Sequence, residues 1–136
     1  MESQANVPKG YHTVTPYLVV EGVPGLIEFL KTAFGATERM RNLRPDGTVS
    51  HAEVEIGDSV VMMGEPQEAG SAMPGMIHLY VADADATYRQ ALRAGGSSLR
   101  EPADQPYGDR MAGIKDQFGN QWWIATPVTT ATARSG

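Results

Sequence analysis

The chain has 136 residues, of which 41% are hydrophobic and 20% charged, and this composition is typical of one globular domain. It contains no cysteine, which excludes a disulfide framework, a thiolate metal site and a cysteine nucleophile. The formal net charge is −5 and the basic residues are scattered, so we expect no nucleic acid as a partner. Residues 1–10 are polar and no apolar run reaches membrane-spanning length, so we expect no membrane partner and a cytoplasmic location.

The first half of the chain begins with a strand pattern and continues into a helical one. Polar and apolar residues alternate in residues 15–20, which predicts a strand. Apolar residues then recur at the spacing of one helix face, which predicts a helix over residues 22–34. Strand-like stretches follow, and turns at residues 45–47 and 57–58 separate them.

The second half repeats this pattern. Residues 76–100 align with residues 15–39 without a gap, and both segments pass from a strand pattern to a helical one. The second helix is predicted over residues 83–94, with Asp83 as its N-cap and the Gly95-Gly96 pair at its end.

Matching hairpins follow the two predicted helices. Residues 55–63 predict a hairpin around Gly57, and residues 117–125 predict the corresponding hairpin around Gly119. Each half therefore reads as a strand, a helix and three further strands. The sequence predicts an α+β fold built from two tandem βαβββ modules.

The predicted modules define the domain boundaries. Residues 65–75 are rich in glycine, proline and small residues, which indicates a linker between the halves. The ends of the chain have no such pattern, so we expect flexible tails. The predicted organisation is one domain over residues 11–127, with module one at 11–64, module two at 76–127, and tails at 1–10 and 128–136.

Several segments resemble a known family. They are PYLVVEG (16–22), IEFLKTAFGA (27–36), HAEVEIGDSVVMM (51–63), LYVADADA (79–86), and above all YGDR (107–110) with DQFGNQW (116–122). With these segments the chain resembles the vicinal-oxygen-chelate superfamily of glyoxalase, fosfomycin resistance and bleomycin resistance proteins, in particular its PhnB-like branch. The resemblance implies that the modules form a curved mixed sheet around a cup-shaped cavity, and that the protein is a homodimer.

The resemblance also implies positions for metal ligands. Family members with metal chemistry take His, Gln or Glu ligands from the first and last strands of each module. Those positions fall here on Thr15, on Val61 or Met62, on Met76 and on Trp123. Apart from one weak oxygen on Thr15, these side chains cannot coordinate zinc, nickel, manganese or iron. The resemblance therefore implies a metal-free cup, with no metal ligand and no cofactor.

Strand alternation predicts which side chains face the cup. Ala52, Val54 and Ile56 are expected to pack on the helices, which places His51 and Glu53 on the opposite face. The same argument, together with the loop before the seventh strand, gives the predicted ligand-binding residues: Thr15, Tyr17, Met62, Met76, Tyr80, Tyr107, Arg110, Gln121 and Trp123.

His51, Glu53 and His78 are the candidate catalytic residues. One interpretation is proton transfer, in which Glu53 orients a histidine that acts as a general base. A second is an unusual metal site formed by the three side chains. The third is structural, because His51 and Glu53, two apart on one strand face, would satisfy each other near the rim.

Tyr107 and Arg110 belong to a predicted loop at the mouth of the cup. Arg110 would clamp an anionic ligand while Tyr107 stacks on it. The alternative is a local salt bridge of Arg110 that fixes the entry to the strand.

The predicted partner is a small organic molecule. A mostly apolar and aromatic lining with a few polar groups is typical of a binding pocket for a flat or aromatic ligand. The alternatives are a metal-independent enzyme that performs proton transfer or isomerisation through a cavity histidine, and, third, a metal-dependent lyase or dioxygenase with relocated ligands. The sequence leaves open whether the protein is an enzyme.

Overall fold

The computed structural model describes residues 6–128, and the remaining residues of the two predicted tails, 1–5 and 129–136, lie outside the described range. Each half follows the order strand, helix and three strands, which confirms the predicted modules. Module one contains β1–β4 and module two β5–β8. The element bounds are β1 Tyr17–Val19, α1 Val23–Phe34, β2 Thr37–Leu43, β3 Val49–Ile56, β4 Ser59–Gly64, β5 Met76–Tyr80, α2 Ala84–Arg93, β6 Ser97–Asp104, β7 Asp109–Lys115 and β8 Gln121–Pro127.

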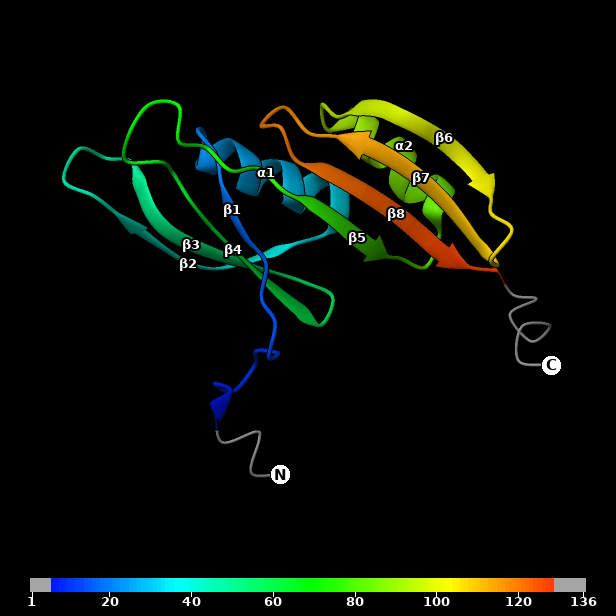
Figure 1. Ribbon diagram of the computed structural model, residues 1–136, viewed down its shortest axis with the longest axis horizontal. Coiled ribbons are helices and arrows are strands. Elements are labelled where there is room, and N and C mark those ends of the chain that lie inside the picture. The colour runs from blue at the N-terminus through cyan, green and yellow to red at the C-terminus, as the bar shows by residue number, and fades with distance from the viewer. Residues whose placement is uncertain (1–5, 129–136) are drawn as a thin grey trace.

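Each module forms a four-stranded mixed sheet of the same topology. The strand orders are β1-β4-β3-β2 and β5-β8-β7-β6. In each sheet the two strands that pair in parallel are the first and the fourth of the module in chain order, β1 with β4 and β5 with β8. Both predicted hairpins are present, because β3 pairs antiparallel with β4 and β7 with β8. The two sheets lie side by side, with β1 and β5 toward the middle of the molecule (Figure 1).

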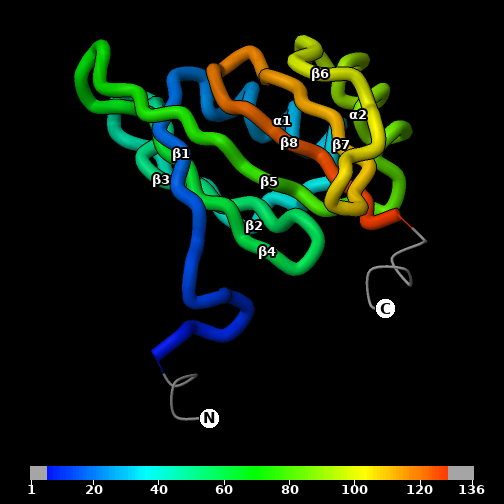
Figure 2. Tube along the Cα trace, turned by 45° about the vertical axis from the view of Figure 1, so that its right-hand side comes forward, coloured from blue at the N-terminus to red at the C-terminus, as the bar shows by residue number. Residues whose placement is uncertain are grey.

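The core lies between the sheets and the two helices. Figure 2 shows both helices on the same side of the strands. The predicted alternation of β3 is confirmed, since Ala52, Val54 and Ile56 are buried toward the helices. On α1, the apolar side chains repeat at helical spacing and are fully buried at Leu26 and Leu30. The helices do not cover the opposite face of each sheet, which we call the cup face.

The two helices begin in different ways. Asp83 is the N-cap of α2, as predicted, and its carboxylate accepts a hydrogen bond from the backbone N–H of Ala86 at 3.1 Å. The N-cap of α1 is Gly22, which has no side chain to offer. The carboxylate of Glu65 replaces it and accepts from the N–H groups of Gly22 and Val23 at 2.9 and 3.1 Å. Glu65, which the sequence placed in the linker, is thus part of the helix start.

Contacts of α1 join the two modules. The ring of Phe34 lies 5.2 Å from that of Trp122 on β8. Phe118, in the turn between β7 and β8, lies against the start of α1, where a Cβ atom built on Gly25 would be 2.9 Å from its ring. The absence of side chains at Gly22 and Gly25 therefore allows this close approach.

The turn between β7 and β8 is organised by a buried carboxylate. Asp116 accepts hydrogen bonds from the N–H groups of Phe118 and Asn120, from the Asn120 amide at 2.9 Å and from the Trp122 indole at 2.9 Å. The Asn120 side chain in turn accepts from the N–H of Gly75, just before β5. This network satisfies polar groups that would otherwise be buried without partners.

Within residues 6–128, neither helix has the length and apolar character required to span a bilayer.

Candidate functional site

The cup face of module one carries a connected set of polar side chains. His51 and Glu53 share this face of β3, as predicted, and the imidazole Nε2 lies 2.8 Å from a carboxylate oxygen of Glu53. The other ring nitrogen of His51, Nδ1, lies 3.1 Å from the hydroxyl of Tyr17 on β1. Three side chains from two strands therefore form a continuous chain of contacts.

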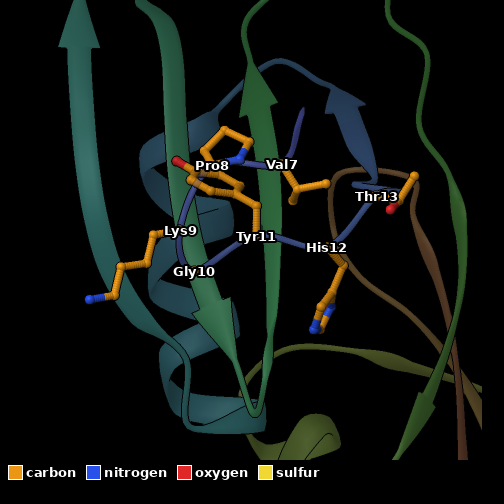
Figure 3. A pocket seen from close by; sticks show the side chains of 7 residues that line it. All are labelled: Val7, Pro8, Lys9, Gly10, Tyr11, His12 and Thr13. Carbon is orange, nitrogen blue, oxygen red and sulfur yellow. The ribbon is translucent and has the colours of Figure 1, made fainter. Parts of the chain in front are cut away.

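Two further residues, Tyr11 and Arg39, complete this set. The Tyr11 hydroxyl donates a hydrogen bond to Glu53, and the Arg39 guanidinium lies 3.8 Å from the same carboxylate. Arg39 also lies over the Tyr11 ring, 5.1 Å from its centroid. Figure 3 shows Tyr11 and Pro8 among the residues that line one hollow, with the side chains of Lys9 and His12 pointing away from Tyr11. We call Tyr11, Tyr17, Arg39, His51 and Glu53 the module-one cluster.

Sequence reasoning missed Tyr11 and Arg39. In the sequence, Tyr11 is only the first residue of the predicted domain. Arg39 lies beside Glu53 because β2 and β3 pair with a register shift between Glu38 and Met40. The one available signal was the pairing of β2 with β3, which places a basic residue opposite two acidic ones.

The surroundings of Glu53 keep its carboxyl ionised. The residue is only 4% exposed, and burial acts to raise its pKa. Hydrogen bonds from Tyr11 and His51, together with the nearby charges, outweigh burial and hold the pKa below its ordinary value of 4.5. The hydrogen bond to Glu53 also raises the pKa of Tyr11 above its ordinary value of 10.0.

A depression lies beside the module-one cluster. It has a volume of 610 Å³, and its lining includes Tyr11, His12, Thr15 and Met62. A neighbouring hollow of 650 Å³ is formed by residues 7–13 (Figure 3). Residues 6–10, predicted as part of a flexible tail, therefore contribute to the surroundings of the cluster.

Apolar and aromatic side chains gather on the cup face of module two. A depression of 440 Å³ is lined by Met76, His78, Tyr107, Met111 and Trp123. These side chains come from β5, β7, β8 and the loop before β7. The depression thus joins predicted ligand-binding residues with Met111, which the sequence analysis did not select.

The indole of Trp123 is fixed on this cup face by two neighbours. Its N–H donates to the side-chain oxygen of Gln121 at 3.1 Å. Its ring lies over Gly113, where a Cβ atom would be 2.5 Å from the indole. The absence of a side chain at Gly113 on β7 therefore provides the space that the indole of Trp123 occupies.

The structure does not join His78 to the other candidate catalytic residues. His78 packs against Tyr80 on β5, with ring centroids 4.9 Å apart. Among residues 6–128, no three His, Asp or Glu side chains converge as a metal site would require. The unusual metal site of His51, Glu53 and His78 is therefore wrong for this structure.

Arg110 is engaged by carboxylates. Two of its nitrogens lie 2.6 and 3.0 Å from the Asp85 carboxylate, and a third lies 3.2 Å from Asp104. This geometry favours the local salt bridge over an anion clamp. Tyr107 donates to the sulfur of Met111 at 3.5 Å and lines the module-two depression without Arg110.

Comparisons with known proteins place this geometry in a family. An uncharacterized protein of Mycobacterium bovis is 36% identical over 126 residues, which cover 85% of this chain and 83% of that protein. The anthracycline biosynthesis protein DnrV of Streptomyces peucetius is 32% identical over 114 residues, which cover 74% of this chain and 41% of DnrV. The crystal structure of TioX from Micromonospora sp. ML1 has the same fold, with a TM-score of 0.73 at 22% identity, covering 86% of this chain and 99% of TioX.

The family model of glyoxalases, bleomycin resistance proteins and dioxygenases matches residues 11–124. This match covers both modules, including the module-one cluster and the apolar depression of module two. The chain therefore belongs to the glyoxalase/bleomycin resistance protein/dioxygenase superfamily.

Proposed function

We propose that the chain binds a flat, largely apolar organic molecule on the cup face of module two, without a metal. The observation that carries this proposal is the 440 Å³ depression, whose lining combines two aromatic rings, two thioethers and one imidazole. A lining of this kind, with few polar groups, is typical of small-molecule sites. Aromatic rings supply flat contact area, and methionines adapt to irregular shapes.

Exposure of the lining supports the same proposal. Met76, Tyr107 and the adjacent Tyr80 are between 53% and 68% exposed, although large apolar side chains are normally buried. The indole of Trp123 is held by Gln121 and needs no rearrangement to receive a ring. A relative named for anthracycline biosynthesis agrees with this ligand class, since anthracyclines are fused-ring aromatic compounds.

A fluorescence titration with daunorubicin, an anthracycline, tests this proposal. We expect saturable quenching of the tryptophan emission. We expect Met76→Ser to raise Kd by about tenfold, equivalent to about 1.4 kcal/mol. Gly113→Ala should weaken binding as well, because its methyl group would displace the indole of Trp123. Oligomeric state is measured in parallel, because the family resemblance also predicts a homodimer.

Met73→Ser is the matched control for Met76→Ser. Met73 is 69% exposed and Met76 68%, but only Met76 lines the depression. Binding that is equally weakened by both substitutions would contradict the proposed site. Dialysis against a chelator should leave Kd unchanged. Binding that requires a stoichiometric metal would overturn the metal-free part of the proposal.

A second candidate function is proton transfer at the module-one cluster. The contact of 2.8 Å between His51 and Glu53 favours it, because a buried ionised carboxylate is the usual partner that orients a histidine base. The adjoining depression of 610 Å³ provides room for a ligand. Acylation of histidine by diethyl pyrocarbonate tests whether His51 differs in reactivity from the more exposed His12.

A further inference from the structure

We propose that the phenol of Tyr17 is the group that exchanges a proton with a molecule bound on the cup face of module one, with His51 and Glu53 as a relay behind it. This inference rests on the second candidate function and names the side chain that touches the ligand. Three residues form one line of contacts, with 3.1 Å from the Tyr17 oxygen to Nδ1 of His51 and 2.8 Å from Nε2 to Glu53. From the sequence, Tyr17 is predicted only as a ligand-binding residue.

The charge of Glu53 sets the direction of both hydrogen bonds. An ionised carboxylate only accepts hydrogen bonds, so Nε2 of His51 carries the proton in this pair. In the neutral imidazole the other nitrogen, Nδ1, is then an acceptor. The hydroxyl of Tyr17 therefore donates to Nδ1. His51 is in position to take the phenol proton, just as a histidine takes the proton of a nucleophilic hydroxyl in a catalytic triad.

Tyr11 and Arg39 are positioning residues that act through Glu53. The hydroxyl of Tyr11 donates to one carboxylate oxygen, while the other oxygen faces His51. Arg39 contributes positive charge at 3.8 Å and shares it with Glu55 at 3.6 Å. Together these groups fix the rotamer of Glu53 and keep it negative, and its charge would stabilise an imidazolium.

Tyr17 is the most accessible member of the relay. It is 45% exposed, whereas the side chain of His51 is 28% exposed and that of Glu53 5%. Thr15 and Met62, which line the depression, lie next to Tyr17, because Thr15 is two positions earlier and Met62 is its partner across the parallel pair. Tyr17 and His51 are not themselves part of the lining, but Tyr17 is paired with a lining residue and is the more exposed of the two. A ligand that extends from the depression over this face would therefore meet Tyr17 before His51.

This arrangement suits a molecule whose C–H bond is acidified by a neighbouring carbonyl group, because the phenol passes the proton on and the imidazole is the base that finally takes it. The C–H bond breaks and its proton moves to the oxygen of Tyr17 as the phenol proton moves to Nδ1 of His51. The electron pair stays on the ligand as an enolate, and the imidazolium is paired with Glu53. Return of the proton to a different ligand atom completes an isomerisation that needs no co-reactant.

Labelling with phenylmethanesulfonyl fluoride tests the activation of Tyr17. The phenol oxygen attacks sulfur, fluoride leaves and the phenol proton passes to His51. Tyr80 serves as internal comparison, because it is 64% exposed and its aromatic neighbour His78 contacts it through the ring. Peptide mass spectrometry of the full chain should show Tyr17 labelled at least about tenfold faster than Tyr80, a factor within the range of base assistance.

Two variants decide between explanations of that rate. His51→Gln should lower labelling of Tyr17 to the rate of Tyr80, and Tyr17→Phe should remove it, with circular dichroism as the check on folding. Equal rates for Tyr17 and Tyr80, or fast labelling that persists in His51→Gln, would overturn the inference. If Tyr17 is inert while diethyl pyrocarbonate modifies His51 faster than His12, the Tyr17 assignment fails and the histidine function remains.

The tautomer of His51 tests the positioning role of Glu53. Nitrogen-15 NMR should show the proton on Nε2 in the native chain. In Glu53→Gln the amide N–H can donate to Nε2, which would move the proton to Nδ1 and release Tyr17. An unchanged tautomer in Glu53→Gln, or a proton on Nδ1 in the native chain, would contradict the relay. If Glu53 had only a structural role, Glu53→Gln would lower stability but the proton of His51 would stay on the same ring nitrogen.

Discussion

Module one and module two share a topology, but the side chains on their cup faces differ in chemical character. In module one, charged and hydroxyl groups form a connected cluster, to which the segment before β1 contributes Tyr11. In module two, aromatic and thioether side chains line an open depression. One topology therefore carries two cup faces of different composition, because the other side of each sheet packs on the helices and leaves the cup face free to vary.

The modules also differ in how they satisfy backbone groups. Module two uses nearby residues, since Asp83 caps its own helix and Asp116 organises its own turn. Module one depends on Glu65, which lies after β4 and reaches back to Gly22 and Val23. The difference predicts that point substitutions will damage the two modules to different degrees.

The largest effect is expected for Asp116→Ala in module two. The substitution removes the acceptor of two backbone N–H groups, an amide and the Trp122 indole, all of which are buried or partly buried. We expect the free energy of unfolding to fall by about 3–5 kcal/mol, because buried donors left without partners are costly. Urea denaturation measures this loss. A loss below about 1 kcal/mol would show that water replaces the carboxylate.

An intermediate effect is expected for Glu65→Ala. Its carboxylate accepts from Gly22, Val23 and Val49, the last at 2.6 Å. We expect a loss of about 2–3 kcal/mol, compared with about 1 kcal/mol for Asp83→Ala, which removes one cap bond. If Glu65→Ala and Asp83→Ala lowered the free energy of unfolding equally, the start of α1 would not depend on its distant carboxylate more than α2 depends on its own N-cap.

The smallest effect is expected in the pH dependence of module one. The pKa of Glu53 is lowered in the folded state, so its contribution to stability is present above the ordinary value of 4.5 and is lost as pH falls below it. The stability difference between the native chain and Glu53→Gln should therefore stay constant above the ordinary value of 4.5 and shrink as the pH falls below it through the lowered pKa of the folded state. Urea midpoints measure it, with Glu101→Gln on the exposed strand β6 as control. A difference that grows toward acid pH has the wrong sign.

The sequence predicted the fold because the patterns that determine it are local. Alternation along β3 separates Ala52 and Val54 from His51 and Glu53, and glycines mark the hairpins. The contact of His51 with Glu53 followed from the same period of two. The two tandem modules followed from the gapless internal repeat, and the matching strand orders of the two sheets confirm them.

The rest of the site depends on distant contacts. Tyr11 reaches Glu53 across 42 positions of the chain, and no local pattern specifies such a contact. The position of Arg39 depends on an irregular register in β2, which strict alternation does not predict. The partner of Arg110 is Asp85, and residue types alone could not distinguish this pair from an anion site.

The fit of Phe118 against α1 has a consequence for the history of the repeat. If one duplicated segment gave rise to both halves, Gly22 and Gly25 correspond to Asp83 and Ala86 in the second copy. A chain recombined from two copies of module two would carry Cβ atoms where the Phe118 ring now lies, and at the two glycines such atoms would be 2.9 to 3.0 Å from it. The two glycines therefore make module one complementary to the Phe118 turn of module two, and the corresponding residues of module two would not fit there without a shift of this ring.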